Sequence, residues 1–210
     1  MPPNSKLAIE RYKTYAQTYD KEQSRNPNAE ANRRRVIELL ELKPGDVVLD
    51  VGCGTGLNFP AIEAAVGQSG RLIGIDLSSD MLAKARQRVA AEGWQNVTLI
   101  ESPVDKASIP VPADAVLFCF THDVLQAPAA LENVFSATKP GARVAALGYK
   151  WAPWWTGPWN YVIWNFTRYA ITTREGFGKP WRYLPKYVPD LKTESTLMGA
   201  IYFAWGTTPK

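Results

Sequence analysis

The sequence has few of the residues that build metal centres and disulfide frameworks. Among its 210 residues there is one histidine, His122, and there are two cysteines, Cys53 and Cys119, which lack CxxC spacing. A structural zinc site needs a full set of Cys or His ligands. We therefore expect no metal site.

Long apolar runs and a dominant charge are also absent. The first 20 residues contain no uninterrupted apolar stretch. We therefore expect neither a secretory signal nor a transmembrane anchor there, and a cytoplasmic location. The net charge of +4 is spread along the chain, and its one dense basic run, Arg33 to Arg35, is predicted to be a solvated helix face. A small molecule is therefore a more plausible partner than a nucleic acid, and the oligomeric state stays open.

Short apolar segments alternate with helical segments through the middle of the chain. This alternation predicts an α/β fold with a parallel sheet and crossover helices, in three layers. Most of the expected strands are continuous apolar runs, as in strands covered on both faces. They span residues 46–51, 71–76, 96–100, 114–120 and 143–149.

The two ends of the chain differ from this core. Residues 1–45 are predicted to form a helical cap, with Tyr12, Tyr15 and Tyr19 on one face. Two strand-like runs that meet at Gly199 predict a terminal antiparallel hairpin. The length fits a single domain of 1–210, divided into the cap (1–45), a cofactor-binding core (46–149), an aromatic-rich lid (150–180) and a C-terminal helix and hairpin (181–210).

The segment "VVLDVGCGTG" has the composition of a ligand site. A strand, a glycine-rich loop and a helix in succession allow a small molecule to contact the backbone at the carboxyl end of a sheet. Asp76 ends the next strand and can accept hydrogen bonds from both hydroxyls of a ribose. Together these features predict a ligand that contains adenosine.

Two details favour S-adenosylmethionine over a nicotinamide cofactor. Gly52, Gly54 and Gly56 alternate and do not follow the GxGxxG spacing of dinucleotide sites. Asp50, at the base of the loop, would repel a pyrophosphate but attract an ammonium group. The competing interpretation is that the glycines only form a tight turn and that Asp76 caps the following helix.

The chain resembles the seven-stranded, Rossmann-like S-adenosylmethionine-dependent methyltransferases of the small-molecule type. The matching stretches are "YAQTYD", "VVLDVGCGTG", "IGIDLSSDML", "NVTLIESPVD", "ADAVLFCFTHDVLQ" and "ATKPGARVAALG". They occur in the family's order over roughly residues 10 to 149. The resemblance implies a mostly parallel seven-stranded sheet that ends in an antiparallel C-terminal hairpin, with S-adenosylmethionine as cofactor and S-adenosylhomocysteine as product.

The resemblance also implies a set of cofactor-binding residues. In such enzymes the glycine loop lines the methionine portion, the acidic residue after the second strand holds the ribose, and a tyrosine of the cap closes over the methionine end. The set implied here is Tyr19, Asp50, Gly52, Cys53, Gly54, Thr55, Gly56, Asp76, Leu77, Met81, Pro103, Val104 and Phe120. Pro103 is a departure, because the family usually has an aspartate there that binds the adenine amino group; Glu101 and Asp105 are the alternatives.

His122 is the candidate general base. It lies just beyond the fourth expected strand, and the ordinary pKa of histidine suits proton removal near neutral pH. Methyl transfer from a sulfonium needs a base only when the acceptor arrives protonated, since much of the rate comes from positioning. His122 could equally be a structural residue at a strand end, and Asp123 is not expected to form a dyad with it.

Tryptophans crowd the segment after Tyr149. This segment is predicted to be an aromatic lid over an apolar acceptor, with Lys150, Arg168 and Arg174 available to an anionic group. The acceptor-binding residues are then expected to be Tyr15, His122, Lys150, Trp151 and Trp155. The rings could instead pack the flank of the sheet or lie in a membrane interface.

The functional hypothesis is methyl transfer to an O, N or C atom of a small aromatic or otherwise apolar metabolite. Within the same class, the alternative acceptor is a lipid headgroup or a prenylated quinone at a membrane surface. An alternative of another class is a protein that binds the cofactor without methyl transfer.

Overall fold

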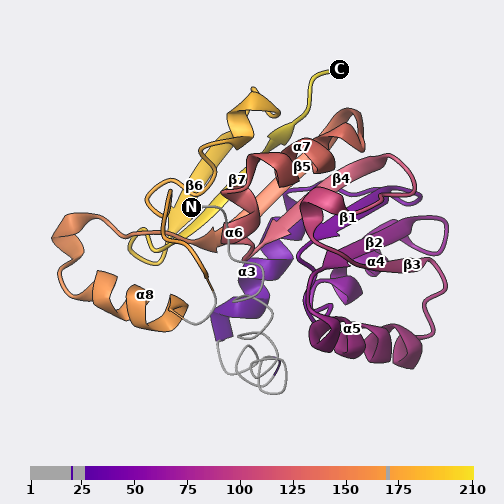
Figure 1. Cartoon of the computed structure of the whole chain (residues 1–210), viewed down its shortest axis with the longest axis horizontal. Helices are drawn as coiled ribbons and strands as arrows, with labels where there is room; N and C mark the ends of the chain where they lie inside the picture. The colour runs from indigo at the N-terminus through magenta and orange to yellow at the C-terminus, as the bar shows by residue number, and fades with distance from the viewer. Residues whose placement is uncertain (1–19, 21–26, 169–170) are drawn as a thin grey trace.

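The computed structural model describes residue 20 and residues 27–168 and 171–210. Within these residues the chain forms a seven-stranded sheet in the order β3-β2-β1-β4-β5-β7-β6 (Figure 1). β1 to β5 run parallel, and β7 lies antiparallel to both β5 and β6. The strands are β1 (Val47–Val51), β2 (Arg71–Asp76), β3 (Val97–Glu101), β4 (Ala113–Cys119), β5 (Thr138–Tyr149), β6 (Lys192–Thr196) and β7 (Ile201–Thr207). The predicted α/β fold with an antiparallel terminal hairpin is confirmed.

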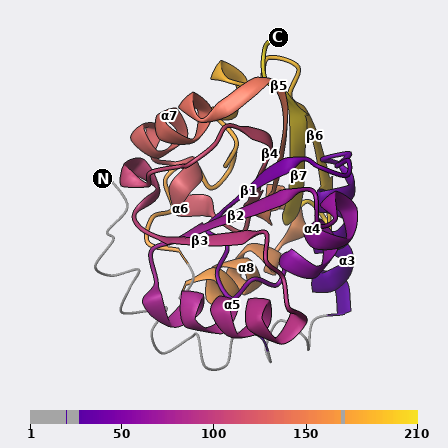
Figure 2. The same ribbon diagram turned by 90° about the vertical axis from the view of Figure 1, so that its right-hand side faces the viewer.

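Helices cover both faces of the sheet. The α-helices are α3 (Pro27–Glu38), α4 (Phe59–Val66), α5 (Ser79–Glu92), α6 (His122–Leu125), α7 (Pro128–Ser136) and α8 (Trp159–Thr167). The 3₁₀ turns are η1 (Val104–Lys106), η2 (Trp154–Thr156) and η3 (Leu184–Lys186). α3, α4 and α5 pack on one face, whereas α6, α7 and η3 pack on the other. Figure 2 shows this layering, with α3 and α4 on one side of the sheet and α6 and α7 on the other.

The continuous apolar runs follow from this two-sided burial. Along β4, Leu117 and Cys119 belong to the core cluster under α3 to α5, and Val116 and Phe118 belong to the cluster under α6 and α7. Successive side chains of a strand point to opposite faces, so both sets of positions must be apolar. The continuous apolar run of β4 thus indicates a strand that is covered on both faces.

Local signals explain where α5 begins and ends. Ser78 is its N-cap, and its hydroxyl accepts a hydrogen bond from the Met81 N–H at 3.3 Å. Gly93 is its C-cap at φ +72°, a left-handed conformation that glycine adopts without a steric penalty. Both boundaries agree with the sequence prediction, and they place the start of α5 directly after Asp76.

Three details differ from the expectations. The helix expected after residue 181 is limited to the 3₁₀ turn η3, because Pro189 lacks the N–H that would continue a helix and disfavours a helical conformation at Val188. β5 begins at Thr138, before the predicted residue 143, and its register with β4 shifts between Ala113 and Ala115. Arg33 is 8% exposed and so does not lie on a solvated face, although Arg34 does. The cap residues Tyr12, Tyr15 and Tyr19 lie outside the described residues.

Candidate active site

The carboxyl ends of the parallel strands meet at one edge of the sheet, here called the carboxyl edge. β1, β2, β4 and β5 end there at Val51, Asp76, Cys119 and Tyr149. Ligands of open α/β sheets bind outside the carboxyl ends of the strands. Most of the predicted site residues that the structure describes lie in the loops that follow these strand ends.

Two of the three glycines in the loop have no space for a side chain. Gly52, Gly54 and Gly56 have φ values of +71°, +56° and +76°, all in the left-handed region. A Cβ atom on Gly52 would overlap the Thr121 side chain, and one on Gly56 would lie 2.7 Å from the Phe59 ring. A Cβ on Gly54 would meet nothing within 4 Å. Gly54 is therefore the point where the loop faces open space, and where a ligand can approach the backbone.

Asp76 fastens the glycine loop to the end of β2. Its Oδ2 accepts a hydrogen bond from Gly54 N–H and its Oδ1 accepts one from Ser78 N–H, each at 2.8 Å. Burial raises the pKa of Asp76 above its ordinary value, and these N–H donors act in the opposite direction. Because each carboxylate oxygen can accept more than one hydrogen bond, the contacts leave acceptor capacity for ribose hydroxyls.

Asp50 lies beneath the loop, fully buried at 0% exposure. Burial raises its pKa to about 7, while the hydrogen bond from Asn58 Nδ2 at 3.1 Å and the charge of Arg33 lower it. The Asn58 Oδ1 atom is buried and has no hydrogen-bond partner among the described residues. Asp50 thus polarises an amide whose free oxygen can accept a hydrogen bond from a cationic donor.

Thr55 joins the loop to two segments that are distant in sequence. Its hydroxyl donates to Asp20 Oδ1 at 2.6 Å, and its carbonyl oxygen accepts from Arg88 Nε at 3.2 Å. Arg88 also binds Asp20 through its Nη2 at 3.0 Å. The result is a closed triangle, here called the Asp20 latch, between the segment before α3, the glycine loop and α5.

A strained residue directly follows β4. Phe120 has a φ of +59°, which is unusual for a bulky side chain and carries a conformational cost. Its ring lies 5.2 Å from that of Tyr149 at the end of β5. The next residue, Thr121, lies against Gly52, and its buried Oγ1 has no partner among the described residues. Strain of this kind concentrates where a loop must present particular groups.

His122 is buried, with 7% of its surface exposed. Its Nε2 lies 3.1 Å from the Glu175 carbonyl oxygen, and since a carbonyl can only accept, the Nε2 atom carries the proton. Nδ1 is then an unprotonated acceptor, and it has no partner among the described residues. Burial lowers the pKa of His122, whereas the nearby Asp123 raises it. Asp123 itself accepts hydrogen bonds from Thr172, so the two residues form no dyad.

Aromatic residues bring part of the predicted acceptor site to His122. The Phe177 ring lies 5.1 Å from His122 and 4.9 Å from Trp151, both edge to face. Lys150 donates to the Trp151 carbonyl oxygen at 3.4 Å. Trp155 is 64% exposed and does not join this cluster.

The residues predicted to bind adenine are in part exposed or already bound to other groups. Cys53 and Met81 are buried, whereas Leu77, Pro103 and Val104 are partly exposed. Pro103 precedes η1, and the Val104 carbonyl oxygen accepts from Asn133 at 2.7 Å. Glu101 forms an ion pair with Arg86 at 3.4 Å, and Asp105 is exposed in η1.

Several residues of this edge were not identified from the sequence. Asn58 follows the loop directly, and a polar residue at the start of a buried helix was the available signal. Thr121 and Phe177 carry no such signal, because only the tertiary fold brings them to the loop and to His122. Arg88 lies 33 residues from Thr55, and no periodicity relates the two.

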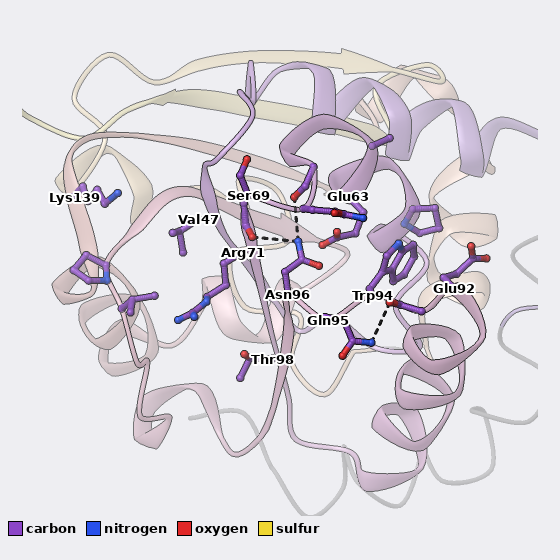
Figure 3. A pocket seen from close by; sticks show the side chains of 18 residues that line it. Val47, Glu63, Ser69, Arg71, Glu92, Trp94, Gln95, Asn96, Thr98 and Lys139 are labelled. Atoms are coloured by element: carbon purple, nitrogen blue, oxygen red, sulfur yellow. Dashed lines mark hydrogen bonds between the residues drawn. The ribbon is translucent and has the colours of Figure 1, made fainter.

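A separate groove of about 1190 Å³ opens at the opposite end of the sheet. It is lined by the segments that precede β1 to β4, with Arg71, Trp94 and Asn96 among its residues (Figure 3). Asn96 binds the Gly67 and Gly70 carbonyl oxygens there, at 3.1 and 3.2 Å. None of the predicted site residues lines this groove, so the candidate site is the carboxyl edge.

Within the described ranges, no group of His, Cys, Asp and Glu side chains is arranged to hold a metal ion. In the same part of the chain, no helix is both long and apolar enough to cross a bilayer.

Residues 48–141 match a family model described as a methyltransferase domain. A demethylmenaquinone methyltransferase of Symbiobacterium thermophilum is 32% identical over 119 residues, which cover 54% of this chain and 47% of that protein. A 2-phytyl-1,4-naphtoquinone methyltransferase of Thermosynechococcus vestitus is 25% identical over 175 residues, which cover 80% of this chain and 76% of that protein. The chain thus spans about half of the first of these relatives.

Solved structures show the same fold. An S-adenosylmethionine-dependent methyltransferase from Aquifex aeolicus superposes with a TM-score of 0.58 at 24% identity, over 84% of this chain and 89% of that one. The N-methyltransferase NodS from Bradyrhizobium japonicum, in complex with S-adenosylhomocysteine, superposes with a TM-score of 0.64 at 14% identity, over 88% and 89% of the two chains. Over residues 48–141 the chain is thus similar to the methyltransferase domain family, and its seven-stranded sheet has the fold of the class I, Rossmann-like S-adenosylmethionine-dependent methyltransferases.

Proposed function

We propose that the chain transfers the methyl group of S-adenosylmethionine to an O, N or C atom of a small aromatic or otherwise apolar metabolite. The observation that carries this proposal is that three of the seven buried polar atoms without partners among the described residues lie at the carboxyl edge: Asn58 Oδ1, Thr121 Oγ1 and His122 Nδ1. All three belong to the segments that follow the adjacent strands β1 and β4. Buried polar atoms are rarely left without a partner, so these three are available to a bound molecule and to the water that it would displace.

The chain's residues fit the polar groups of S-adenosylmethionine. Asp76 offers acceptor capacity to the ribose hydroxyls, and the open side of Gly54 admits the methionine portion. Asn58 Oδ1 suits the ammonium group, and the Nδ2 of the same amide donates to the Asp50 carboxyl group beneath it. Leu77 and Met81 would flank the adenine, and the adenine amino group would find Glu101 or Asp105 in place of the aspartate that Pro103 replaces. The bound cofactor would supply an activated methyl group on a cationic sulfur.

His122 is proposed to accept a proton from the methyl acceptor. Its Nε2–H is held by the Glu175 carbonyl, so the free lone pair on Nδ1 is the basic site. Because burial lowers its pKa, the ring is neutral, and therefore able to act as a base, at neutral pH. The Trp151 and Phe177 rings beside it would bind the flat or apolar face of the acceptor.

The relatives support an apolar ring as acceptor. Two of them are named as methyltransferases of demethylmenaquinone and of 2-phytyl-1,4-naphtoquinone. A prenylated quinone is thus the second candidate acceptor, favoured by the exposed aromatic side chains after β5. A cytoplasmic location forms part of the proposal and is supported by Cys53 and Cys119, which are both unpaired.

Calorimetry tests the cofactor assignment. We expect S-adenosylmethionine and S-adenosylhomocysteine to bind, NADH not to bind, and Asp76→Ala to weaken cofactor binding by about tenfold or more, since it removes charge-assisted hydrogen bonds. Asp114→Ala, at the opposite end of the sheet, is the matched control. Binding of NADH in place of S-adenosylmethionine would reject the proposal, and unchanged affinity in Asp76→Ala would reject the ribose contact. Methyl uptake by a panel of phenols, amines and quinols would then identify the acceptor.

A further inference from the structure

A cluster of exposed aromatic and apolar side chains follows β5, and we name it the aromatic face. Its residues come from η2 and α8: Trp154, Trp155, Tyr161, Val162, Trp164 and Phe166. Trp154 is 90% exposed and Tyr161 is 70% exposed. A single exposed apolar residue is ordinary, but a contiguous group of large rings marks an interaction surface.

The β6–β7 turn adds apolar surface beside this face. Leu197 and Met198 are exposed at the tip of the turn. The next residue, Gly199, lies so close to Pro153 that a Cβ would be 2.7 Å from its Cδ atom. Pro153 immediately precedes η2, so the turn lies against the start of the aromatic face.

The aromatic face lies at the carboxyl edge. β5 ends at Tyr149 just before it, and the β6–β7 turn projects from the same edge because β7 runs antiparallel to β5. Figure 1 shows α8 extending away from the sheet below the ends of β6 and β7. A partner bound to this face would therefore meet the entrance to the candidate active site.

Basic residues accompany the aromatic face in the sequence. Residues 150–174 contain Lys150, Arg168 and Arg174, and the acidic residue that follows, Glu175, forms an ion pair with Arg182 at 2.7 Å. The guanidinium groups of Arg168 and Arg174 lie over the Trp164 ring, each at 5.8 Å. Tryptophan and tyrosine beside basic residues are the composition of protein surfaces that sit in the headgroup region of anionic membranes.

α8 is attached to the rest of the protein along one side. Ile163 and Thr167 are its buried residues, and Ile163 packs with Ala152 and Phe177. Trp159 and Asn160 at its start are half-buried, and Asn160 is hydrogen-bonded to the Ala152 backbone. The remaining positions of this nine-residue helix are exposed, and a helix of this length is too short to span a bilayer. Its geometry suits a position in the plane of the membrane interface.

We propose that the aromatic face docks on an anionic phospholipid bilayer and that the acceptor is an apolar molecule drawn from that bilayer. The docking stands on the exposed rings and on the charge around them. The choice of acceptor rests on the proposed methyl transfer. In this arrangement His122 and Trp151 lie behind the docked face, where an apolar molecule leaving the lipid would enter.

Vesicle flotation tests the docking. The probes are vesicles of phosphatidylcholine alone and of phosphatidylcholine mixed with phosphatidylglycerol. We expect binding to the mixed vesicles, weaker binding to the neutral ones, and a decrease with salt. Trp154→Ala/Tyr161→Ala should reduce vesicle binding by about tenfold or more, because it removes the two most exposed rings. Arg168→Ala should weaken binding to the mixed vesicles, and Arg34→Ala, which makes the same charge change on α3, should not.

Two results would overturn the docking proposal. One is the absence of binding to either type of vesicle. The other is self-association in light scattering that the double variant abolishes, which would assign the face to a second copy of the chain. If docking fails while S-adenosylmethionine still binds and a soluble phenol is methylated, the proposed function survives. If the vesicles bind but S-adenosylmethionine does not, the docking survives and the proposed function is wrong.

Discussion

At the carboxyl edge, single residues combine a strained backbone with polar atoms that the described fold does not use. Phe120 adopts a left-handed φ directly before Thr121 and His122, which carry two of the unpartnered atoms. A bulky residue in this conformation persists only where the surroundings enforce it. The strain and the free lone pairs occur together, as expected where the backbone is shaped to present groups to a ligand.

The role of His122 predicts a pH profile. The pKa of His122 is lowered, so kcat/KM should fall on the acid side only as the pH drops below the usual histidine range, where the ring becomes protonated and can no longer act as a base. His122→Gln should remove this limb and lower kcat/KM by about 10²- to 10⁴-fold. The measurement is methyl transfer from pH 5 to 9 with the best acceptor from the panel. Unchanged S-adenosylhomocysteine affinity of His122→Gln is the control for folding. If the variant keeps wild-type rates across the whole pH range, His122 is not a base and catalysis depends on positioning alone.

At the level of elements, the glycine loop is held from three sides. Asp76 binds it to β2, Thr121 packs on it from β4, and the Asp20 latch ties it to α5. These contacts add to the constraint that the glycines themselves place on the loop conformation. Loop positions that many elements determine are suited to hold a ligand at a defined place.

The Asp20 latch predicts that Arg88 supports cofactor binding without touching the cofactor. Arg88→Ala should weaken S-adenosylhomocysteine binding by about tenfold, since it removes two hydrogen bonds, one of them to a charged group. Arg88→Lys should rescue this only in part, because an ammonium cannot reproduce the fork of the guanidinium. The measurement is titration calorimetry.

Arg86→Ala is the matched control for the latch. It lies on the same helix, and its ion pair with Glu101 is exposed. Its removal leaves the Glu101 carboxylate in place for the adenine amino group and should change affinity little. Equal losses in the Arg86 and Arg88 variants would show that the effect comes from the helix and not from the latch.

The sequence predicts elements better than it predicts contacts between them. Each predicted core strand is present, because two-sided burial imposes an apolar run on strands such as β4. The ends of α5 were predictable from Ser78 and Gly93, whose local chemistry is sufficient. Asn58, Thr121, Phe177 and Arg88 were not predicted to act together at the edge, since their partners are distant in sequence.

For the whole molecule, the buried carboxylate of Asp50 links the free energy of unfolding to pH. Its pKa rises from 3.8 to about 7 on folding, so the folded state binds the proton more tightly than the unfolded state. The contribution of protonated Asp50 to the free energy of unfolding is fully present below about pH 4 and is lost as the pH rises through 7. At most, the loss is about 1.4 kcal/mol per pH unit between these values.

Asp50→Asn should remove this dependence. The measurement is urea unfolding at each pH. The free energy of unfolding of the variant minus that of the wild type should increase from pH 5 to 7 and level off above pH 7. Asp190→Asn is the control: the Thr207 N–H lowers the pKa of Asp190, so its contribution is constant over this range and is lost only under more acidic conditions. If the free energies of unfolding of the wild type and of Asp50→Asn change with pH in parallel, burial does not raise the pKa of Asp50.

The position of β7 affects the order in which the chain can fold during synthesis. β1 is synthesised first, and β2, β3, β4 and β5 can each join an edge that earlier residues have already formed. β7 instead lies between β5 and β6, although it is made after both. Its buried residues Tyr202 and Phe203 complete the two core clusters. A ribosome-bound chain that stops short of residue 201 therefore leaves β5 with an open edge, and its exposed backbone is available to other nascent chains until the hairpin closes over it.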